Sequence, residues 1–506
     1  MHVQSHRTWA CIATMFRAAA LASALLAAAP AEGQTIGKDT LIAWGREAYD
    51  LSVAQLRVPG SSLFAESANL SGERFGGSGG FAFVWPASIQ FRVLNALAEL
   101  DPAAFANVQR SYSTELQSRY WRWTTSGGYR SGVPNGDLFY DDNAHLVVAL
   151  ADAYTLTGDP IFLSRARATY RFVERGENDA GGGGIYFKEN DFGWKDAIST
   201  LQAARSATML YRITGENGYL TDATRLYGWA ADTLQWADGR FWEKLYLAGP
   251  KAGTLGDHAI VNSAGIGLSC NVELYKATGD GAYIAEAQRI ADISVRSYFD
   301  PTTFRINDEG FWAFELVDGL IDLYEIDGNR RWRTAVERGL AWLHAHKRDA
   351  NGHYGLFWGR GGDQTLPLES WNLIDQAPVA RAYLSLALAQ ERLSGDFDRD
   401  GDVDGADLLQ WQLQSGATTV PGLGADASSD GRVNAVDLAA WKNYFSSGLT
   451  AAASIPVPEP APWPAAVGLA SAARLWRRRV IGKRKAESRG RKAESGAAGC
   501  ADCLAF

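Results

Sequence analysis

The chain has 506 residues, of which 46% are hydrophobic and 21% are charged. This length leaves room for more than one domain, and this composition is typical of a soluble globular protein, so global disorder and a polytopic membrane protein are both disfavoured. The 49 Lys and Arg against 57 Asp and Glu give a net charge of −8. Because basic residues crowd the far C-terminus, the rest of the chain is more acidic still, and no nucleic-acid partner is expected.

The N-terminal segment has the organisation of a secretory signal peptide. Arg7 and Arg17 come before or at the start of an apolar run over 18–29, and small residues follow as far as Gly33. We therefore expect residues 1–33 to be removed and the mature protein to be secreted or held at the cell surface. Of the four cysteines, Cys270 alone lies in the expected globular region, so no disulfide framework is predicted.

Residues 34–394 are predicted to form an all-α domain built from helical hairpins. Apolar side chains recur at helical spacing between Ala144 and Tyr154, and again between Leu163 and Val173. The joint between two such helices is a Tyr followed four residues later by Gly, which can end a helix in the left-handed conformation. This joint recurs at Gly158, Gly215, Gly279 and Gly328.

About six such helix pairs fit the domain. The same periodicity is compatible with a closed (α/α)6 toroid and with an open solenoid. The irregular intervals between the joints and the long inserts favour the toroid.

An adjacent carboxylate pair, Asp141 and Asp142, opens the helix that continues through Val148. Hydrolysis of a glycosidic bond needs one ionised and one protonated carboxyl group, and two close carboxyls push each other's pKa values apart. Acids in a first helical turn also cap the helix and complement its dipole. The pair by itself therefore fits both a catalytic and a structural role.

A glycine-rich loop follows, in which backbone can approach a ligand closely or simply form a flexible turn. Two aromatic residues beyond it, Tyr186 and Trp194, offer flat faces for stacking on a sugar.

Three motifs in this region resemble those of glycoside hydrolase family 76 in their order and approximate spacing. They are Tyr140-Asp-Asp-Asn143, Gly181-Gly-Gly-Gly-Ile-Tyr186 and Trp194-Lys-Asp-Ala-Ile-Ser199. The resemblance extends from about Trp85 to Ala377. That family contains endo-α-1,6-mannanases with an (α/α)6 barrel and a retaining mechanism.

The resemblance implies a glycosidase that acts on α-mannan-type polysaccharide, with Asp141 as the nucleophile, Asp142 as the general acid/base and no cofactor for catalysis. The sequence Asn262-Ser-Ala-Gly265 departs from the family's Asn-Gln-Gly pattern, which leaves the linkage and the endo or exo mode open. The expected substrate-binding residues are Tyr140, Asn143, Gly183, Gly184, Tyr186 and Trp194.

Two other classes of function stay open. One is a different (α/α)6 enzyme, such as an unsaturated uronyl hydrolase or a sugar epimerase, and the other is a non-catalytic glycan-binding protein of the cell surface. Epimerases usually depend on histidines near the sugar, and the whole chain has only 7.

A second module is predicted at 395–449, where the pattern of a calcium loop occurs twice. Acidic and other oxygen-bearing side chains occupy the ligand positions of both loops, and Trp441 repeats Trp411 at the same offset. The segment resembles a type I dockerin, an EF-hand-like module, which implies two Ca²⁺ ions and a cohesin-like partner. The expected metal ligands are Asp396, Asp398, Asp400, Asp404 and Asp407 in the first loop, and Asp426, Ser428, Asp430, Asn434 and Asp437 in the second.

Residues 450–506 form the last predicted segment. Val457-Pro-Glu-Pro460, a mostly apolar stretch over 461–476 and the basic run 477–479 resemble a PEP-CTERM sorting signal, which implies attachment to or processing at the cell envelope. A disordered basic tail is the alternative.

Overall fold

The structure is a computed structural model, and it describes residues 36–364, 366–389, 393–398, 400 and 402–452. The predicted signal peptide at 1–33 and nearly all of the predicted sorting segment at 450–506 lie outside these residues. None of the helices in the described ranges is long and apolar enough to cross a membrane.

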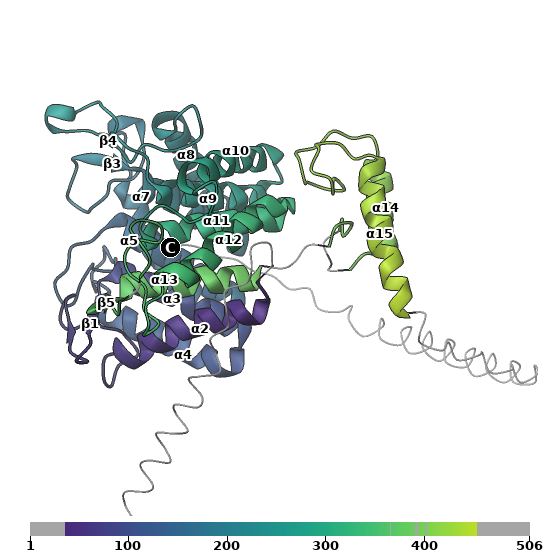
Figure 1. The fold of residues 1–506 in the computed structure, drawn as a ribbon. Helices are drawn as coiled ribbons and strands as arrows, with labels where there is room; N and C mark the ends of the chain where they lie inside the picture. The colour runs from purple at the N-terminus through teal and green to yellow at the C-terminus, as the bar shows by residue number, and fades with distance from the viewer. Residues whose placement is uncertain (1–35, 365, 390–392, 399, 401, 453–506) are drawn as a thin grey trace, which may run out of the picture. The chain divides into compact units, whose positions relative to one another are not determined.

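Twelve helices within the described residues form a toroid of two layers (Figure 1). Each inner helix packs against two inner neighbours, and contact between the last and the first closes the ring. The inner helices are α3 (Val84–Leu100), α5 (Tyr140–Thr157), α7 (Ala197–Thr214), α9 (Val261–Thr278), α11 (Gly310–Asp327) and α13 (Leu373–Leu388). The outer helices are α2 (Lys38–Gln55), α4 (Pro102–Tyr120), α6 (Pro160–Val173), α8 (Asn217–Leu234), α10 (Gly281–Tyr298) and α12 (Arg330–Lys347). The predicted (α/α)6 toroid is thus confirmed.

The inner helices are buried on all sides, whereas the outer helices are buried on one face only. In the inner helix α9 every residue from Val261 to Leu274 is buried. The outer helix α8 instead buries a stripe that runs from Ala223 to Leu234 at helical spacing and leaves its other face to solvent. A helix with one apolar stripe lies between core and water, whereas a helix buried all round lies inside.

The predicted glycine joints are also confirmed. Gly158, Gly215, Gly279 and Gly328 end the inner helices α5, α7, α9 and α11 in the left-handed conformation, with φ of 67–72°. The N–H of each donates to the carbonyl of the Tyr four residues earlier, at 2.7–2.8 Å. Because these joints are short, each outer helix runs antiparallel to its inner partner. All inner helices therefore begin at one end of the toroid, here called the mouth, and finish at the other, the base.

The connections at the mouth are long and contain short strands that were not predicted. β1 (Ser67–Asn69) pairs antiparallel with β2 (Arg74–Phe75) and with β5 (Ser370–Asn372), so that Ser67 lies opposite Asn372. β3 (Trp194–Asp196) pairs with β4 (Lys244–Tyr246). Three short 3₁₀ helices complete the connections, η1 (Glu174–Gly176), η2 (Ala180–Gly182) and η3 (Gly249–Lys251). These strands fix the loops around the helix starts.

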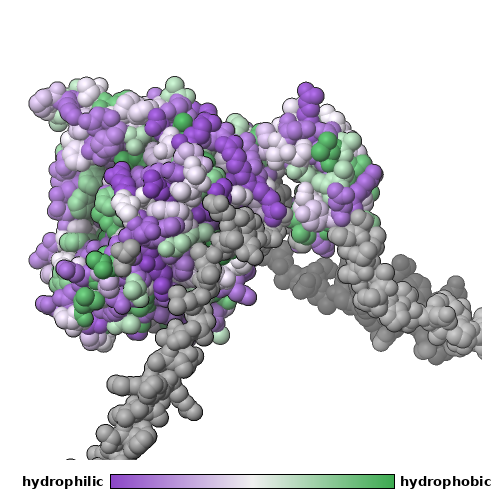
Figure 2. Space-filling view, viewed as in Figure 1, coloured by the Kyte–Doolittle hydropathy of each residue, from purple (hydrophilic) through white to green (hydrophobic). Residues whose placement is uncertain are grey.

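Several large apolar side chains on the mouth connections are exposed. Trp123, Phe192 and Leu366 are exposed to 72%, 61% and 72%, and they belong to three different connections. Hydrophilic residues predominate on the face shown in Figure 2, where apolar residues form small patches. Two of these exposed side chains, Trp123 and Phe192, are aromatic.

Charged side chains occupy the interior of the toroid. Arg92 of α3 is 1% exposed, and its guanidinium contacts Glu315 at 2.9 Å and Asp318 at 2.6 Å, both on α11. His145 of α5 lies 3.3 Å from the Glu315 carboxylate, and Arg205 of α7 lies 3.6 Å from it. This set of five residues, the axial network, joins four of the six inner helices.

The C-terminal module contains α14 (Gly405–Gln414) and α15 (Ala435–Ala452), which follow the two predicted calcium loops. Its small core includes Phe397, Val433 and Trp441. The Trp411 indole donates to the carbonyl of Asn434 at 2.9 Å, and the Trp441 indole donates to the carbonyl of Asp404 at 2.7 Å. The Trp of each repeat therefore donates a hydrogen bond to the equivalent position in the loop of the other repeat.

Close packing between α9 and α11 yields a stability prediction. A Cβ at Gly265 would lie 2.3 Å from the backbone of Glu315, whereas a Cβ at Gly228 in α8 would meet no atom within 4 Å. We expect Gly265→Ala to lower the free energy of unfolding by about 1–3 kcal/mol through overpacking. The control Gly228→Ala should raise it by about 0.5–1 kcal/mol, because Ala favours the helix. Chemical denaturation measures both, and equal stability of the two variants would contradict the close approach of α9 and α11.

Candidate active site

The adjacent carboxylates lie in the first turn of α5, at the mouth. Asp142 is 8% exposed, and Asp141 has one carboxylate oxygen that is buried and has no hydrogen-bond partner among the described residues. The preceding Phe139 occupies the N-cap position without a side-chain hydrogen bond. The N–H of Tyr140 donates to the carbonyl of Phe187 at 2.9 Å, which ties the start of the helix to the next mouth connection.

Burial raises the pKa of both carboxyls. It raises the pKa of Asp142 to about 7. It raises the pKa of Asp141 well above its ordinary value, and the neighbouring carboxyls of Asp142 and Asp196 raise that pKa further. The helix N-terminus favours negative charge, but desolvation outweighs it here. Two interacting carboxyls titrate as a pair, so near neutral pH this pair can hold one proton and one negative charge.

Asp196 is a third carboxylate near the pair, and sequence analysis did not select it. It caps α7, because its side chain accepts the N–H of Ser199 at 2.8 Å and the hydroxyl of the same residue at 3.0 Å. Burial raises the pKa of Asp196 to about 6. Its place in the Trp194–Ser199 motif was the available signal, although capping alone would account for an Asp three residues before a Ser.

Two of the expected substrate-binding residues are buried and stabilise the start of α5. Asn143 is fully buried, its Oδ1 accepts the N–H of Tyr129 at 2.7 Å, and its Nδ2 donates to the carbonyls of Tyr129 and Phe139 at 3.0 and 2.7 Å. Tyr140 is 6% exposed, and its ring stacks on Phe172 at 4.9 Å. Both residues therefore present little surface to a substrate and position the carboxylate pair.

The glycine-rich loop packs so closely against an outer helix that it needs glycine at two positions. A Cβ at Gly183 or Gly184 would lie 2.9 or 2.4 Å from the indole of Trp229 in α8. The Trp229 Nε1–H donates to the carbonyl of Gly181 at 2.9 Å. Lys195 is buried and donates to the carbonyl of Gly184 at 2.8 Å, so the loop is held from both sides.

The two expected stacking residues differ in exposure. Tyr186 is 4% exposed, its ring lies 3.7 Å from the Lys195 ammonium, and its hydroxyl donates to Asn178 at 3.2 Å. Trp194 is half-buried and stacks on Phe187, with ring centroids 5.8 Å apart. Of the two, Trp194 is the ring with surface available for a ligand.

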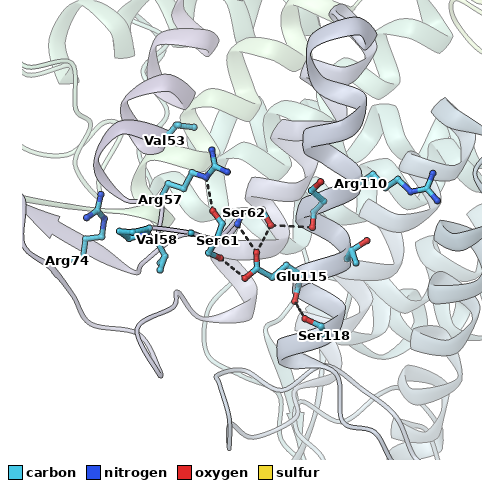
Figure 3. A pocket seen from close by; sticks show the side chains of 13 residues that line it. Val53, Arg57, Val58, Ser61, Ser62, Arg74, Arg110, Glu115 and Ser118 are labelled. Atoms are coloured by element: carbon cyan, nitrogen blue, oxygen red, sulfur yellow. Dashed lines mark hydrogen bonds between the residues drawn. The ribbon is translucent and has the colours of Figure 1, made fainter.

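A cavity of about 1100 Å³ lies away from the carboxylate pair, between the segment after α2 and helix α4 (Figure 3). Arg57, Arg74 and Arg110 lie around it, and its Glu115 already accepts hydrogen bonds from Ser61 and Ser62. Among the residues that the structure describes, no aromatic ring lines this cavity. It therefore lacks both the stacking face and the paired acids expected of a glycosidase site.

The expected metal ligands of the first loop fall into two groups of close carboxylates. Oxygen atoms of Asp396, Asp398 and Asp400 lie within 4.8 Å of one another, and those of Asp404 and Asp407 lie equally close to one another and to Asp402, which was not among the expected ligands. Partial desolvation and then nearby carboxylates raise the pKa of Asp398. Closely spaced carboxylate oxygens fit a hard cation such as Ca²⁺.

The second loop has the same backbone arrangement. The Asp407 carboxylate accepts the N–H of Asp398 at 3.1 Å, and that of Asp437 accepts the N–H of Ser428 at 2.9 Å. Asp426 accepts the hydroxyl of Ser428 at 3.1 Å, and Asp430 accepts the Asn434 amide at 3.1 Å. These hydrogen bonds link Asp437 and Asp426 with Ser428, and Asp430 with Asn434, within the second loop.

Comparison with protein families gives two matches. The family model described as Glycosyl hydrolase family 76 matches residues 69–310, and the model described as Dockerin type I domain matches residues 394–446. Among curated proteins no sequence relative was found.

Three solved structures illustrate the shared fold. A GH76 α-mannanase of Bacteroides thetaiotaomicron has 24% identity and a TM-score of 0.63, with 69% of this chain and 95% of that chain covered. A GH76A α-1,6-mannanase variant of Salegentibacter has 20% identity and a TM-score of 0.59, with 69% and 100% covered. It is described as inactive, with two consecutive aspartates replaced by asparagine, and is in complex with α-1,6-mannotriose. A cellobiose 2-epimerase of Bacillus thermoamylovorans has 14% identity and a TM-score of 0.56, with 69% and 99% covered.

The raised pKa of Asp142 predicts a pH-dependent change in stability. The folded chain holds the Asp142 proton up to about pH 7, whereas an unfolded Asp loses its proton near pH 4. The fold therefore loses stability as pH rises from about 4 to about 7, and Asp142→Asn should remove this penalty. The free energy of unfolding of Asp142→Asn should exceed that of the wild type only slightly near pH 4. This difference should grow as pH rises and become constant above about pH 7.

Chemical denaturation across this range measures the effect. The exposed Asp137 of the preceding connection provides the control Asp137→Asn, which should show a much smaller dependence on pH. A pH-independent difference between Asp142→Asn and the wild type would contradict the raised pKa.

Proposed function

We propose that this chain, which contains a glycosyl hydrolase family 76 domain and a type I dockerin domain, is a secreted glycosidase that cleaves α-1,6-mannosidic bonds with the pair Asp141 and Asp142. The observation that carries the proposal is the burial of two adjacent carboxyls at the mouth, because it lets the pair hold one proton and one charge near neutral pH. The loss of activity on replacing two consecutive aspartates in the Salegentibacter mannanase supports the same pair here.

The proposed reaction has two steps and retains the anomeric configuration. In the first, Asp141 attacks the anomeric carbon as the carboxylate, with the one proton that the pair shares residing on Asp142, and the Asp142 carboxyl gives this proton to the departing glycosidic oxygen. In the second, the Asp142 carboxylate takes a proton from water, which attacks the same carbon and releases Asp141. Retention requires carboxyls about 5 Å apart, a distance that converging side chains in one helical turn can span.

The surroundings of the pair suit a neutral sugar. Asp196 adds a third buried carboxyl that can accept a hydroxyl, and Trp194 with Phe187 provides a stacked aromatic surface next to it. Gly183 and Gly184 let the loop pack closely against Trp229, and the buried Tyr186, Tyr140 and Asn143 hold the neighbouring segments in place. Proton and charge transfer by the carboxyls needs no cofactor in this scheme.

For the dockerin domain we propose two Ca²⁺ ions, one in each loop. The ten expected ligands would supply oxygen atoms only, and the bound ions would offset the repulsion among the carboxylates. A cohesin-like partner would then connect the glycosidase to other proteins at the cell surface. The predicted signal peptide and the predicted sorting segment would bring the chain to that location.

The first test of this function replaces each carboxyl without changing its shape. We expect Asp141→Asn and Asp142→Asn each to lower the rate of α-1,6-mannan hydrolysis roughly a thousandfold, because one loses the nucleophile and the other the proton donor. Circular dichroism checks that the variants fold, and Asp137→Asn should keep wild-type activity. NMR of the first product should show retained configuration.

Wild-type activity in either variant would exclude that residue from the mechanism. Turnover of a uronate-containing polymer, epimerisation of a disaccharide, or glycan binding without turnover would each favour one of the alternative functions over mannan hydrolysis.

The second test addresses calcium. Calorimetric titration of the full chain should show two Ca²⁺ ions, and Asp400→Ala and Asp430→Ala should each remove one of them, because each substitution deletes a ligand from a different loop. The double variant should bind neither ion and should keep its activity on mannan. Binding of two ions by the double variant would contradict the assigned ligands, and loss of hydrolysis in a folded double variant would contradict the independence of the two domains.

A further inference from the structure

Another buried carboxyl lies at the mouth, separated from the catalytic pair by helix α3. Asp375 is in the first turn of α13 and is 4% exposed. One of its oxygens accepts the Asn372 amide at 2.8 Å, whereas the other is buried and has no hydrogen-bond partner among the described residues. Buried polar atoms are almost always paired, so this oxygen is suited to a ligand that the chain itself does not provide.

Glu66 brings a second carboxyl to the same corner of the mouth. Its Oε2 accepts the N–H of Phe83 at 2.8 Å, and its backbone carbonyl accepts the N–H of Leu373 at 2.8 Å. Glu66 thereby joins the starts of α3 and α13. Burial raises the pKa of Glu66, and burial together with the Glu66 charge raises the pKa of Asp375 to about 6.

Aromatic rings lie at this corner. Trp85, the second residue of α3, meets Phe311 of α11 edge to face at 5.2 Å, and Phe311 meets Trp312 at 5.1 Å. These rings connect the helices on either side of α13, and all three are half-buried. The Trp85 Nε1 is buried and has no hydrogen-bond partner among the described residues, so it is a second unpaired polar atom, at the start of the helix that packs next to α13.

A first-turn acid alone would explain Asp375 as a partner of the helix dipole. That role does not require an unpaired buried oxygen, a neighbouring carboxyl or an indole donor. Hydroxyl groups of a sugar need acceptors and donors together, and its C–H faces need flat apolar surface. A carboxyl that can hold its proton near neutral pH can serve as either acceptor or donor.

We propose that Asp375, Glu66 and Trp85 form a sugar-binding subsite that holds a unit of the polysaccharide remote from the cleaved bond. The inference rests on the proposed function, because it takes the substrate to be a chain that crosses the mouth from α5 to α13. Asp375 and Glu66 bind hydroxyl groups in this subsite, and Trp85 donates its N–H and offers its ring.

Direct binding tests the subsite without turnover. In the full chain carrying Asp141→Asn and Asp142→Asn, adding Asp375→Asn should weaken the binding of α-1,6-mannotetraose about tenfold by calorimetry, which corresponds to one lost hydrogen bond. Asp280 caps the outer helix α10 at the base, so Asp280→Asn is the matched control and should not change affinity. Trp85→Phe keeps a ring and loses the N–H, so it should also weaken binding, and it replaces Asp375→Asn if that variant fails to fold.

Kinetics in the otherwise wild-type chain separates this role from a structural one. Asp375→Asn should raise KM for long oligosaccharides and leave KM for α-1,6-mannobiose and kcat nearly unchanged. Unchanged affinity and KM in both variants, with the wild type active on mannan, would overturn the subsite and leave the proposed function standing. Absence of both binding and cleavage of mannan by the wild type would contradict the proposed function and, with it, this ligand.

Discussion

The burial of charge inside the helical ring is the constraint on which the rest of the fold depends. Arg92 is placed between Glu315 and Asp318 with almost no exposure, and removing one member of such a set leaves the others unpaired at a cost of about 3–5 kcal/mol. His145 joins the network from α5, four residues after Asp141 and thus about one turn along the same helix. The contacts among these buried charges therefore also help to fix the rotation of α5, which carries the carboxylate pair at its start.

The acids at the mouth share one electrostatic environment. Asp142, Asp196 and Asp375 lie at the starts of three different inner helices, where the helix dipole favours a carboxylate. Burial nevertheless raises the pKa of each to about 6 or 7. Desolvation thus dominates, and it produces a mouth rich in carboxyls that are only partly charged near neutral pH. Such a surface suits uncharged carbohydrate better than a strongly cationic ligand.

The features that could be predicted from the sequence are those that depend on a local pattern of residues. The helical hairpins, their glycine joints and the dockerin module with its two acidic loops were accessible because all their determinants lie within a few turns of chain. Periodicity could not distinguish a closed ring from an open solenoid, since closure depends on contact between α13 and α3. The strands of two or three residues were too short to form a pattern.

The candidate site could be described only in part from sequence, for the same reason. The Asp141–Asp142 pair was visible as a motif. The pKa of Asp375, by contrast, depends in part on the charge of Glu66, which is far away in the chain. The glycine-rich loop was likewise interpreted without Trp229 of α8, against which it packs. The turns at the base are nearly uniform, two residues such as Gly158-Asp159, whereas the mouth connections differ in length and content. Evolution can therefore lengthen or exchange a mouth loop without altering the helix pairing beneath it, and an engineer who grafts such loops between related toroids should be able to change substrate preference one connection at a time.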